Sequence, residues 1–589
     1  MQSRKNVSDA LVIGLEKAGI RDAFVVTGGA IAGFTEALNK SKIIRMHFML
    51  TEQSAAIAAE SYGHFDGNPA LLVVTSGPGV TNALTGVAAA WTNSTPLVII
   101  SGQARSLDVL ANHKFANRQW GNQHLNSVKM VSSITKFVAE PTQAFDAEAA
   151  ALLLVNISKT DRNGPTWLSL PSDIQRAKLD LKNKIANLIE DSQIEKLSFS
   201  EIKSELLMNL LAAKRPVIFL GNGARVTPEV IKELERTASL FGIALITTWT
   251  GMDLVSDNAD TYFGRPGTIA SSRVSNFVIQ ECDLLIILGA RLDLAQIGFR
   301  PEDFAIQAQV LRFDIDPLEF LRIPTRASWQ NYTADAGEIL ESLVVCLQDE
   351  IPDSRLTWIN YLKNLRNLPT GRHYSDITDG VSTYKVISML DERKLCQVML
   401  GSSGTCVEMV LQAWRISSGQ RFLNSGGLGS MGFALAGGIG ISLKTNRQTL
   451  VIESDGSFAM NIQDLETISR NNLNLKIVIL DSSGYKSIKL SQKRQGQTEH
   501  GTSKENGVFL PNAANWARAA GIESLMVDRE DMLENGIAWL MDSCSPRLLQ
   551  VMVSESEEAV PRLISKLNSE GRMETAHFTD LWPEINDAV

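Results

Sequence analysis

The fold of this 589-residue chain is decided by two stretches, Ile452-Glu453-Ser454-Asp455-Gly456-Ser457-Phe458 and Leu480-Asp481-Ser482-Ser483-Gly484-Tyr485. Each includes or directly follows an apolar run, over 449–452 and 475–480, that is typical of a buried parallel strand. Between them, residues 461–469 carry apolar side chains at helical spacing, so the unit is expected to be strand, helix, strand. Open α/β sheets bind their ligands at the carboxyl ends of such strands.

Asp455 and Ser482 are expected to lie at that edge of the sheet. Magnesium prefers hard oxygen donors and usually shares them with phosphate oxygens. Gly456 and Ser457 open a helix, whose first N–H groups favour an anion. The sequence therefore predicts a site for a magnesium ion and a diphosphate.

Composition narrows the function classes. The net charge of −9 argues against a nucleic-acid partner, which needs clustered Lys and Arg. No apolar run reaches about 18 residues, so we expect no membrane span. The charged start is not followed by an apolar segment, so we expect no secretory signal. The five cysteines form no CxxC pair, which favours buried free thiols in a reducing cytoplasm.

Three α/β blocks follow one another along the chain, each alternating apolar strand-like runs with helical segments. We expect three doubly wound parallel-sheet domains, at residues 1–178, 195–350 and 375–560, and a tail at 561–589. The expected strands of the first two blocks are 23–26, 70–74, 97–100 and 166–171, then 216–220, 244–247, 284–288 and 310–314.

Four further features, a glutamate at a helix start and three glycine-containing segments, are either functional or needed for packing. Glu52 stands where a strand-like run enters an Ala-rich helix, a place for a helix-dipole partner or for a buried acid that protonates a ring nitrogen. Gly77 and Gly79 form a turn that permits close backbone approach to a ligand. In the third block, residues 424–433 are rich in glycine, and 401–404 resemble a further anion-binding turn.

Together and in this order, these motifs resemble the thiamine-diphosphate-dependent enzymes of the acetolactate synthase (acetohydroxyacid synthase) family, over about residues 5–555. The resemblance implies a pyrimidine-binding, a nucleotide-type and a diphosphate-binding domain. It implies thiamine diphosphate and Mg²⁺ as cofactors, and it leaves FAD, ADP or no ligand open for the central domain. It also implies an active site shared between two chains of a homodimer or homotetramer.

The resemblance implies a role for individual residues. Glu52 would hydrogen-bond the aminopyrimidine ring and exchange a proton with it, and Gln123 would lie near the reacting carbon. Asp455, Ser482 and Gly484 would form the metal site. Met431 would hold the cofactor in a bent shape. The cofactor-binding set is Gly28, Gly29, Asn82, Gly401, Ser402, Ser403, Gly429, Met431, Gly456, Ser457 and Tyr485.

The chain departs from the family pattern at several positions. Asp481-Ser482 stands where two Asn are expected, so Ser482 ligates directly, a water bridges, or Asp481 contributes; we expect Ser482. Ser454 replaces the first Gly of the metal motif, and Thr51 replaces a common His. The tryptophan that favours 2-oxobutyrate as acceptor would fall near Ser491.

The implied reaction is decarboxylation of a 2-oxo acid, most simply pyruvate, with transfer of the two-carbon unit to a second carbonyl. Residues 264–267 and 484–489 are similar to a branch that acts on nucleotide-linked keto-sugars, which is the alternative acceptor. A basic cluster is either the rim of a pocket for such an anion or a solvated face: Lys486, Lys489, Lys493 and Arg494. A cofactor-binding protein without catalysis is the remaining alternative.

Overall fold

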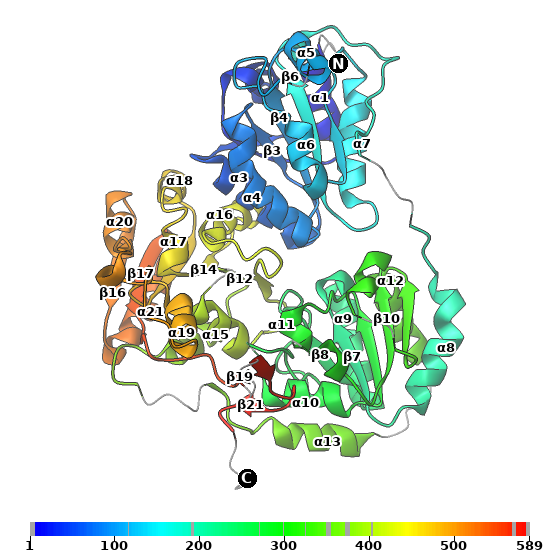
Figure 1. The fold of residues 1–589 in the computed structure, drawn as a ribbon, viewed down its shortest axis with the longest axis vertical. Helices are drawn as coiled ribbons and strands as arrows, with labels where there is room; N and C mark the ends of the chain where they lie inside the picture. The colour runs from blue at the N-terminus through cyan, green and yellow to red at the C-terminus, as the bar shows by residue number, and fades with distance from the viewer. Residues whose placement is uncertain are drawn as a thin grey trace.

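The computed structural model describes residues 6–115, 117–189, 194–269, 271–298, 300–323, 326–348, 355–371, 377–401, 404–567 and 573–584. Figure 1 shows three lobes, each built on its own parallel sheet with helices on both faces. The predicted fold class, three parallel α/β domains, is confirmed.

The first sheet has the strand order β2-β1-β3-β4-β6-β5, all parallel. Its strands alternate their side chains between two apolar cores: Leu71 and Val73 enter one, Leu72 and Val74 the other. The strands are β1 (Asp22–Val25), β2 (Arg45–Phe48), β3 (Leu71–Val74), β4 (Leu97–Gln103), β5 (Phe137–Ala139) and β6 (Pro165–Pro171). The helices are α1 (Val7–Lys17), α2 (Ala32–Asn39), α3 (Glu52–Asp66), α4 (Pro78–Thr92), α5 (Ser106–Phe115), α6 (Ser127–Val131) and α7 (Ala147–Lys159).

The second sheet has the order β11-β10-β9-β7-β8 and is also parallel. Three of its strands coincide with the predicted apolar runs, because these runs are buried on both faces. The strands are β7 (Pro216–Leu220), β8 (Ala244–Thr247), β9 (Leu284–Leu288), β10 (Gln309–Asp314) and β11 (Trp329–Thr333). The helices are α8 (Phe199–Ala212), α9 (Pro228–Phe241), α10 (Arg273–Glu281), α11 (Leu294–Ile297), α12 (Ala336–Leu347) and α13 (Leu356–Leu365).

The third sheet repeats the order of the first, as β13-β12-β14-β15-β17-β16. Its strands are β12 (Gln397–Leu400), β13 (Arg421–Leu423), β14 (Thr449–Ser454), β15 (Leu475–Asp481), β16 (Glu523–Val527) and β17 (Arg547–Met552). Its helices are α14 (Thr383–Asp391), α15 (Thr405–Ala413), α16 (Phe433–Thr445), α17 (Asp455–Phe458), α18 (Asp464–Arg470), α19 (Lys486–Arg494), α20 (Ala513–Ala519) and α21 (Leu533–Met541).

One predicted helix differs from the structure. The segment between β14 and β15 forms two short helices, α17 and α18, instead of one helix over 461–469. The turn between them carries Asn461, which is buried and donates its amide Nδ2 to the carbonyl of Gly432, 2.8 Å away. This tertiary contact replaces the local hydrogen bonds that a continuous helix would make.

The first and third domains share a single apolar core, because α3 packs closely against α16 (Figure 1). Two glycines of α16 allow this approach. A Cβ on Gly440 would lie 2.1 Å from the carbonyl oxygen of Ala58, and one on Gly437 would lie 2.7 Å from Ser61 Oγ. The contact fixes the helix that begins with Glu52 relative to the third domain.

All three domains meet at one buried carboxylate. The side chain of Asp253 has no exposed surface and accepts from Arg225 Nη2 at 2.6 Å, from the backbone N–H of Phe422 at 3.0 Å and from Arg421. The same Arg421 guanidinium donates to the backbone carbonyls of His64 and Phe65 in the first domain. One network thus joins residues from the three lobes.

The C-terminal segment ties the third domain to the second. It includes the short strands β18 (Arg562–Leu563), β19 (Ser565–Leu567), β20 (Met573–Thr575) and β21 (Leu581–Trp582). The Leu563 N–H donates to the carbonyl of Thr268 at 2.7 Å. Phe578 is buried in the second core, with its ring centroid 5.9 Å from that of Phe304.

None of the helices in these described ranges has the length and apolar character needed to cross a lipid bilayer. The five cysteines are free, as expected, but their burial is mixed. Cys282 and Cys406 are buried, Cys346 is intermediate, and Cys396 and Cys544 are exposed, so the expectation that all five are buried is wrong.

Candidate active site

The first candidate edge lies at the carboxyl ends of β2, β1 and β3, which are neighbours in the sheet. Glu52 follows β2 and is the first residue of α3, where Thr51 caps the helix by accepting from the Ser54 N–H. Asn82, on α4, donates its Nδ2 to Glu52 Oε2 at 3.1 Å. The structure therefore brings the expected acid and Asn82 together.

The glycine turn after β3 completes this edge. Gly77 has a positive φ of 60°, and a Cβ there would lie 3.0 Å from the carbonyl oxygen of Gln123. Gln123 is exposed and has a φ of 56°. Gly28 lies against Thr75, while the space around Gly29 is open within 4 Å. Glu52, Asn82, Gln123, Gly28 and Gly29 thus share one end of the first domain.

The second candidate edge lies at the carboxyl ends of β12, β14 and β15 in the third domain. Asp455 follows β14, is 4 % exposed, and accepts from the Gly484 N–H through Oδ2 at 2.8 Å. Ser482 is buried, and its hydroxyl donates to the Gly484 carbonyl at 3.4 Å. The three expected metal-site residues therefore lie within one hydrogen-bonded turn.

The chemistry of this turn fits a divalent cation. Burial and the neighbouring Asp481 charge raise the pKa of Asp455 well above its usual range. A bound cation would favour the ionised carboxylate again. In the described ranges no group of three or more His, Cys, Asp or Glu assembles, so the remaining ligands would be hydroxyl, carbonyl and phosphate oxygens, as Mg²⁺ accepts. Asp481 is otherwise engaged, since Gln550 donates to its Oδ2 at 2.6 Å.

Two glycines near Asp455, Gly456 and Gly401, allow other side chains to pack closely around it. A Cβ on Gly456 would lie 2.5 Å from the ring of Tyr485, so only glycine allows that ring to cover the start of α17. A Cβ on Gly401 would lie 2.2 Å from Glu453 Oε1. Ser402 and Ser403, the other expected members of this turn, lie outside the described residues.

The glycine-rich loop after β13 reaches the same site. Gly429 has a positive φ of 70°, and Met431 is partly buried. Ser457 is buried, and its hydroxyl accepts from the N–H of Gly432 at 2.8 Å. The Ser457 side chain therefore holds the loop, and a ligand would meet its backbone N–H instead.

Sequence reasoning missed Glu453, two residues before the metal position. It has no exposed surface; Oε2 accepts from the Ala434 N–H at 2.9 Å, and Oε1 makes no hydrogen bond in the described chain. Burial raises the pKa of Glu453 to about 7. A charged residue directly after the run 449–452, in the last part of β14, was the available signal.

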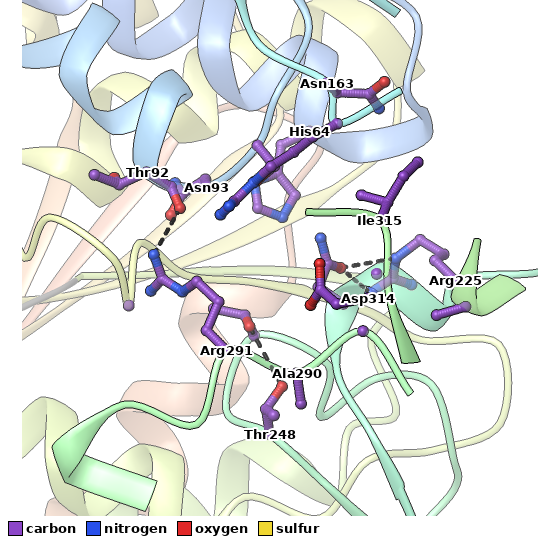
Figure 2. A pocket seen from close by; sticks show the side chains of 18 of the residues that line it. His64, Thr92, Asn93, Asn163, Arg225, Thr248, Ala290, Arg291, Asp314 and Ile315 are labelled. Carbon is purple, nitrogen blue, oxygen red and sulfur yellow. Dashed lines mark hydrogen bonds between the residues drawn. The ribbon is translucent and has the colours of Figure 1, made fainter. Parts of the chain in front are cut away.

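A cavity of about 370 Å³ opens at the carboxyl ends of the central strands, between all three domains (Figure 2). Arg162, Arg225 and Arg291 supply positive charge to its wall. Arg291 Nη1 donates to the Thr92 carbonyl at 3.0 Å, and burial lowers the pKa of this guanidinium. The cavity is thus lined by cations from more than one domain.

Polar groups in the same cavity could bind hydroxyl or amide groups. Burial raises the pKa of Asp314, at the end of β10, to about 6. Gln296 is 5 % exposed, and its Oε1 has no hydrogen-bond partner among the described residues. His64 lines the wall and contacts the buried Glu60 through Nδ1 at 3.2 Å. Asp314 could have been found as the polar end of a predicted strand.

The basic side chains of α19 bind residues 554–558, which follow β17. Lys489 pairs with Glu555 at 2.7 Å and Arg494 with Glu558 at 2.9 Å, while buried Lys486 donates to the Ser554 carbonyl at 2.6 Å. Arg265, in the other segment assigned to keto-sugar binding, is buried and donates to the carbonyl of Trp414. These contacts are structural and do not favour the keto-sugar interpretation.

Comparison with known families agrees with this geometry. Three family profiles match: the N-terminal TPP-binding domain of thiamine pyrophosphate enzymes at residues 5–130, the central domain at 204–343 and the C-terminal TPP-binding domain at 402–551. Their order is the order of the three sheets. The protein is therefore a thiamine-diphosphate-dependent enzyme.

Curated relatives narrow the class. The chain is 29% identical to acetolactate synthase isozyme 2 large subunit of Escherichia coli (strain K12) over 567 residues, 94% of this chain and 97% of the relative. It is 27% identical to acetolactate synthase 2, chloroplastic, of Nicotiana tabacum over 574 residues, 95% of this chain and 83% of the relative. The chain belongs to the acetolactate synthase family of thiamine-diphosphate-dependent enzymes and is a carboligase of that type.

Proposed function

We propose that this enzyme decarboxylates pyruvate and joins the resulting two-carbon unit to the carbonyl of a second 2-oxo acid, with Mg²⁺ as its metal. Thiamine diphosphate, when bound, supplies the carbanion-stabilising chemistry that this reaction needs. The observation that carries the proposal is that every described residue expected at the cofactor lies at the carboxyl edge of one of two sheets, the first and the third.

Asp455 would hold the metal, together with Ser482 Oγ or the Gly484 carbonyl. The start of α17 would hold the diphosphate through its backbone N–H groups, and Tyr485 would cover it. Asp481 would act on the metal through its charge on Asp455, because its own oxygens already accept from Gln550 and from the Ser483 N–H.

Glu52 would exchange a proton with the ring nitrogen of the aminopyrimidine, which is general acid–base work. Asn82 would fix the orientation of that carboxyl through the 3.1 Å hydrogen bond to Oε2. Gln123 would orient the substrate, because it lies beside the Gly77 turn on the same edge and is exposed. Met431 would support the bent cofactor from the other domain.

A second copy of the chain would complete the site. Gln123 contacts the N-terminal end of α4, at Gly77, whereas Gly427 of the glycine-rich loop contacts its C-terminal end, at Thr92. The 15 residues of α4 separate these ends; the distance along the helix is about 21 Å. We infer a homodimer or a homotetramer in which the Glu52 edge of one chain faces the Asp455 edge of another.

The central cavity would bind an anionic nucleotide, with FAD as the candidate that the family resemblance supplies. Arg291 would meet its phosphates, since Arg162 already pairs with Asp316 and Glu319, and Arg225 with Asp253. Asp314 and Gln296 would meet its hydroxyl or amide groups. Protein denaturation followed by visible absorption and mass spectrometry of the released ligand tests this. Recovery of neither a flavin nor another nucleotide would remove this part of the proposal.

The reaction itself is tested by measuring CO₂ release from pyruvate with thiamine diphosphate and Mg²⁺, together with acetolactate in the product mixture. We expect both, and we expect chelation of the metal to stop both. CO₂ release without acetolactate, and with a new product only when a nucleotide-linked keto-sugar is added, would assign the other acceptor. No CO₂ release at any cofactor concentration would refute the proposal.

A further inference from the structure

A second acid lies behind the helix start that carries Glu52. Asp464, the first residue of α18, has no exposed surface. Within the described part of the chain, the Ser54 hydroxyl is the polar group that faces its carboxyl, and no cation pairs with it. A buried carboxyl held by a single hydroxyl lowers stability, whereas an apolar side chain of similar size would raise it. Stability therefore does not explain an aspartate at this position.

The helix of Asp464 and its N-cap residue, Gln463, contact the segment that leads into α3 at three positions. Arg470 Nη2 donates to the carbonyl of Phe48 at 2.9 Å. Gln463 Nε2 donates to Thr51 Oγ1 at 3.5 Å. Between these contacts, the Asp464 carboxyl faces the buried Ser54 hydroxyl. Residues 48–54 thus rest on α18, a helix of the diphosphate-type domain.

Two hydroxyls link this contact to the first turn of α3. Thr51 Oγ1 accepts from the Ser54 N–H at 3.3 Å and donates to Ser54 Oγ at 3.0 Å. Glu52 lies between these two residues in the chain. The orientation of its carboxyl therefore depends on how Thr51 and Ser54 are held.

We propose that Asp464 is a positioning residue for Glu52, acting through Ser54 and Thr51. The inference rests on the proposed role of Glu52 at the cofactor. Asp464 keeps the first turn of α3 in the orientation that aims Glu52 at its ligand, and it does not itself touch the reacting atoms.

If Asp464 positions Glu52, the activity should depend on whether its carboxyl is protonated. Burial raises the pKa of its carboxyl to about 7, and the Ser54 hydroxyl opposes the rise. Among the titratable groups on the elements packed against it, Glu52 lies in the same turn of α3 as Ser54, and the surface pair Glu466–Arg470 lies on its own helix. Glu60, His64 and Asp66 follow further along α3, and Lys444 lies near the end of α16, whose residues 433–442 are mainly apolar. Above about pH 7, a negative charge would therefore form behind the first turn of α3 with no cation bound to it.

The test compares the parent enzyme with Asp464→Leu and Asp464→Asn in the full chain, loaded with thiamine diphosphate and Mg²⁺. Asp464→Leu should lower kcat by roughly tenfold to a hundredfold, because a small misplacement of a catalytic group costs this much. KM for pyruvate and the Kd of thiamine diphosphate should change little. Thermal unfolding should be unchanged or shifted upward, since an unpartnered acid is removed.

Asp464→Asn keeps the shape of the side chain but cannot ionise. It should retain most of the activity at about pH 6 and lack the decline that the parent shows above about pH 7. Asp391→Asn, which changes a buried acid paired with Arg415 far from this segment, is the control and should lower stability without moving the pH profile.

Asp464→Leu with the parent's kcat across this pH range would overturn the proposal. If the leucine variant does not fold, a pH profile of Asp464→Asn that matches the parent's would overturn it instead. Failure of the proposed role of Glu52 is distinguishable, because it would appear as full activity in Glu52→Gln whatever the Asp464 variants show.

Discussion

Replacing Asp253 with alanine should destabilise the protein more than any change of an exposed ion pair. Its carboxylate is the shared acceptor of Arg225 and Arg421, and burial together with the Arg225 charge lowers the pKa of Arg421 to about 10 even with Asp253 in place. Removing one partner of a buried ion pair typically costs about 3–5 kcal/mol. That is a large part of the roughly 5–15 kcal/mol by which domains are stable.

The assay is urea unfolding followed by circular dichroism at neutral pH, with Asp531→Ala as the control. Asp531 pairs with Arg529, but both side chains are about 70 % exposed, so this change should cost less than about 1 kcal/mol. Asp253→Asn should be intermediate, because an amide oxygen still accepts one hydrogen bond. A free energy of unfolding for Asp253→Ala within about 1 kcal/mol of the parent would refute the reasoning.

Other parts of the fold give equally specific expectations. Hydrogen bonds from His47, Arg45 and Tyr62 outweigh burial and lower the pKa of Asp22 from 3.8 to about 2. These hydrogen bonds therefore add about 2 kcal/mol to the free energy of unfolding above about pH 4, and this contribution is lost as the pH falls toward about 2. Urea unfolding of Asp22→Asn should show a loss of stability relative to the parent that becomes smaller over this pH range. A loss that stays constant with pH would contradict the prediction. Gly440→Ala should cost about 1–3 kcal/mol by overpacking against Ala58, measured by thermal unfolding, and an unchanged midpoint would count against the α3–α16 contact. Phe578→Ala should leave a cavity beside Phe304, cost about 3–5 kcal/mol, and expose the C-terminal segment to limited proteolysis; equal cleavage rates would exclude this.

Much of the fold follows from local pattern. The runs 216–220, 244–247 and 284–288 are strands at the predicted bounds, because strands buried on both faces must be continuously apolar. A strand-like run was expected just before Glu52, but the strand lies at Arg45–Phe48, whose residues are partly or fully exposed and pair with β1. The helix expected from residue 461 begins only at Asp464, because Asn461 contacts Gly432, which is 29 residues away in the chain, and periodicity cannot reveal such a contact.

The candidate site was predictable where it depends on order along the chain. Asp455 and Ser482 follow neighbouring strands of the third sheet, and a parallel sheet brings such positions together; Glu52 follows a strand of the first sheet in the same way. Asp464 and Glu453 were not identified, because the burial of an acid without a cation partner is visible only once the surrounding elements are packed. The basic residues of α19 were similarly ambiguous until Glu555 and Glu558 were seen to pair with them.

The central claim, that Glu52 activates thiamine diphosphate in a carboligase, is tested most directly by Glu52→Gln. Calorimetric titration should show a thiamine diphosphate Kd near the parent's in the presence of Mg²⁺, because the metal and diphosphate contacts lie in the other domain. CO₂ release from pyruvate should fall by roughly a hundredfold or more, as loss of general acid–base catalysis predicts. Turnover equal to the parent's, with the cofactor bound, would contradict the account.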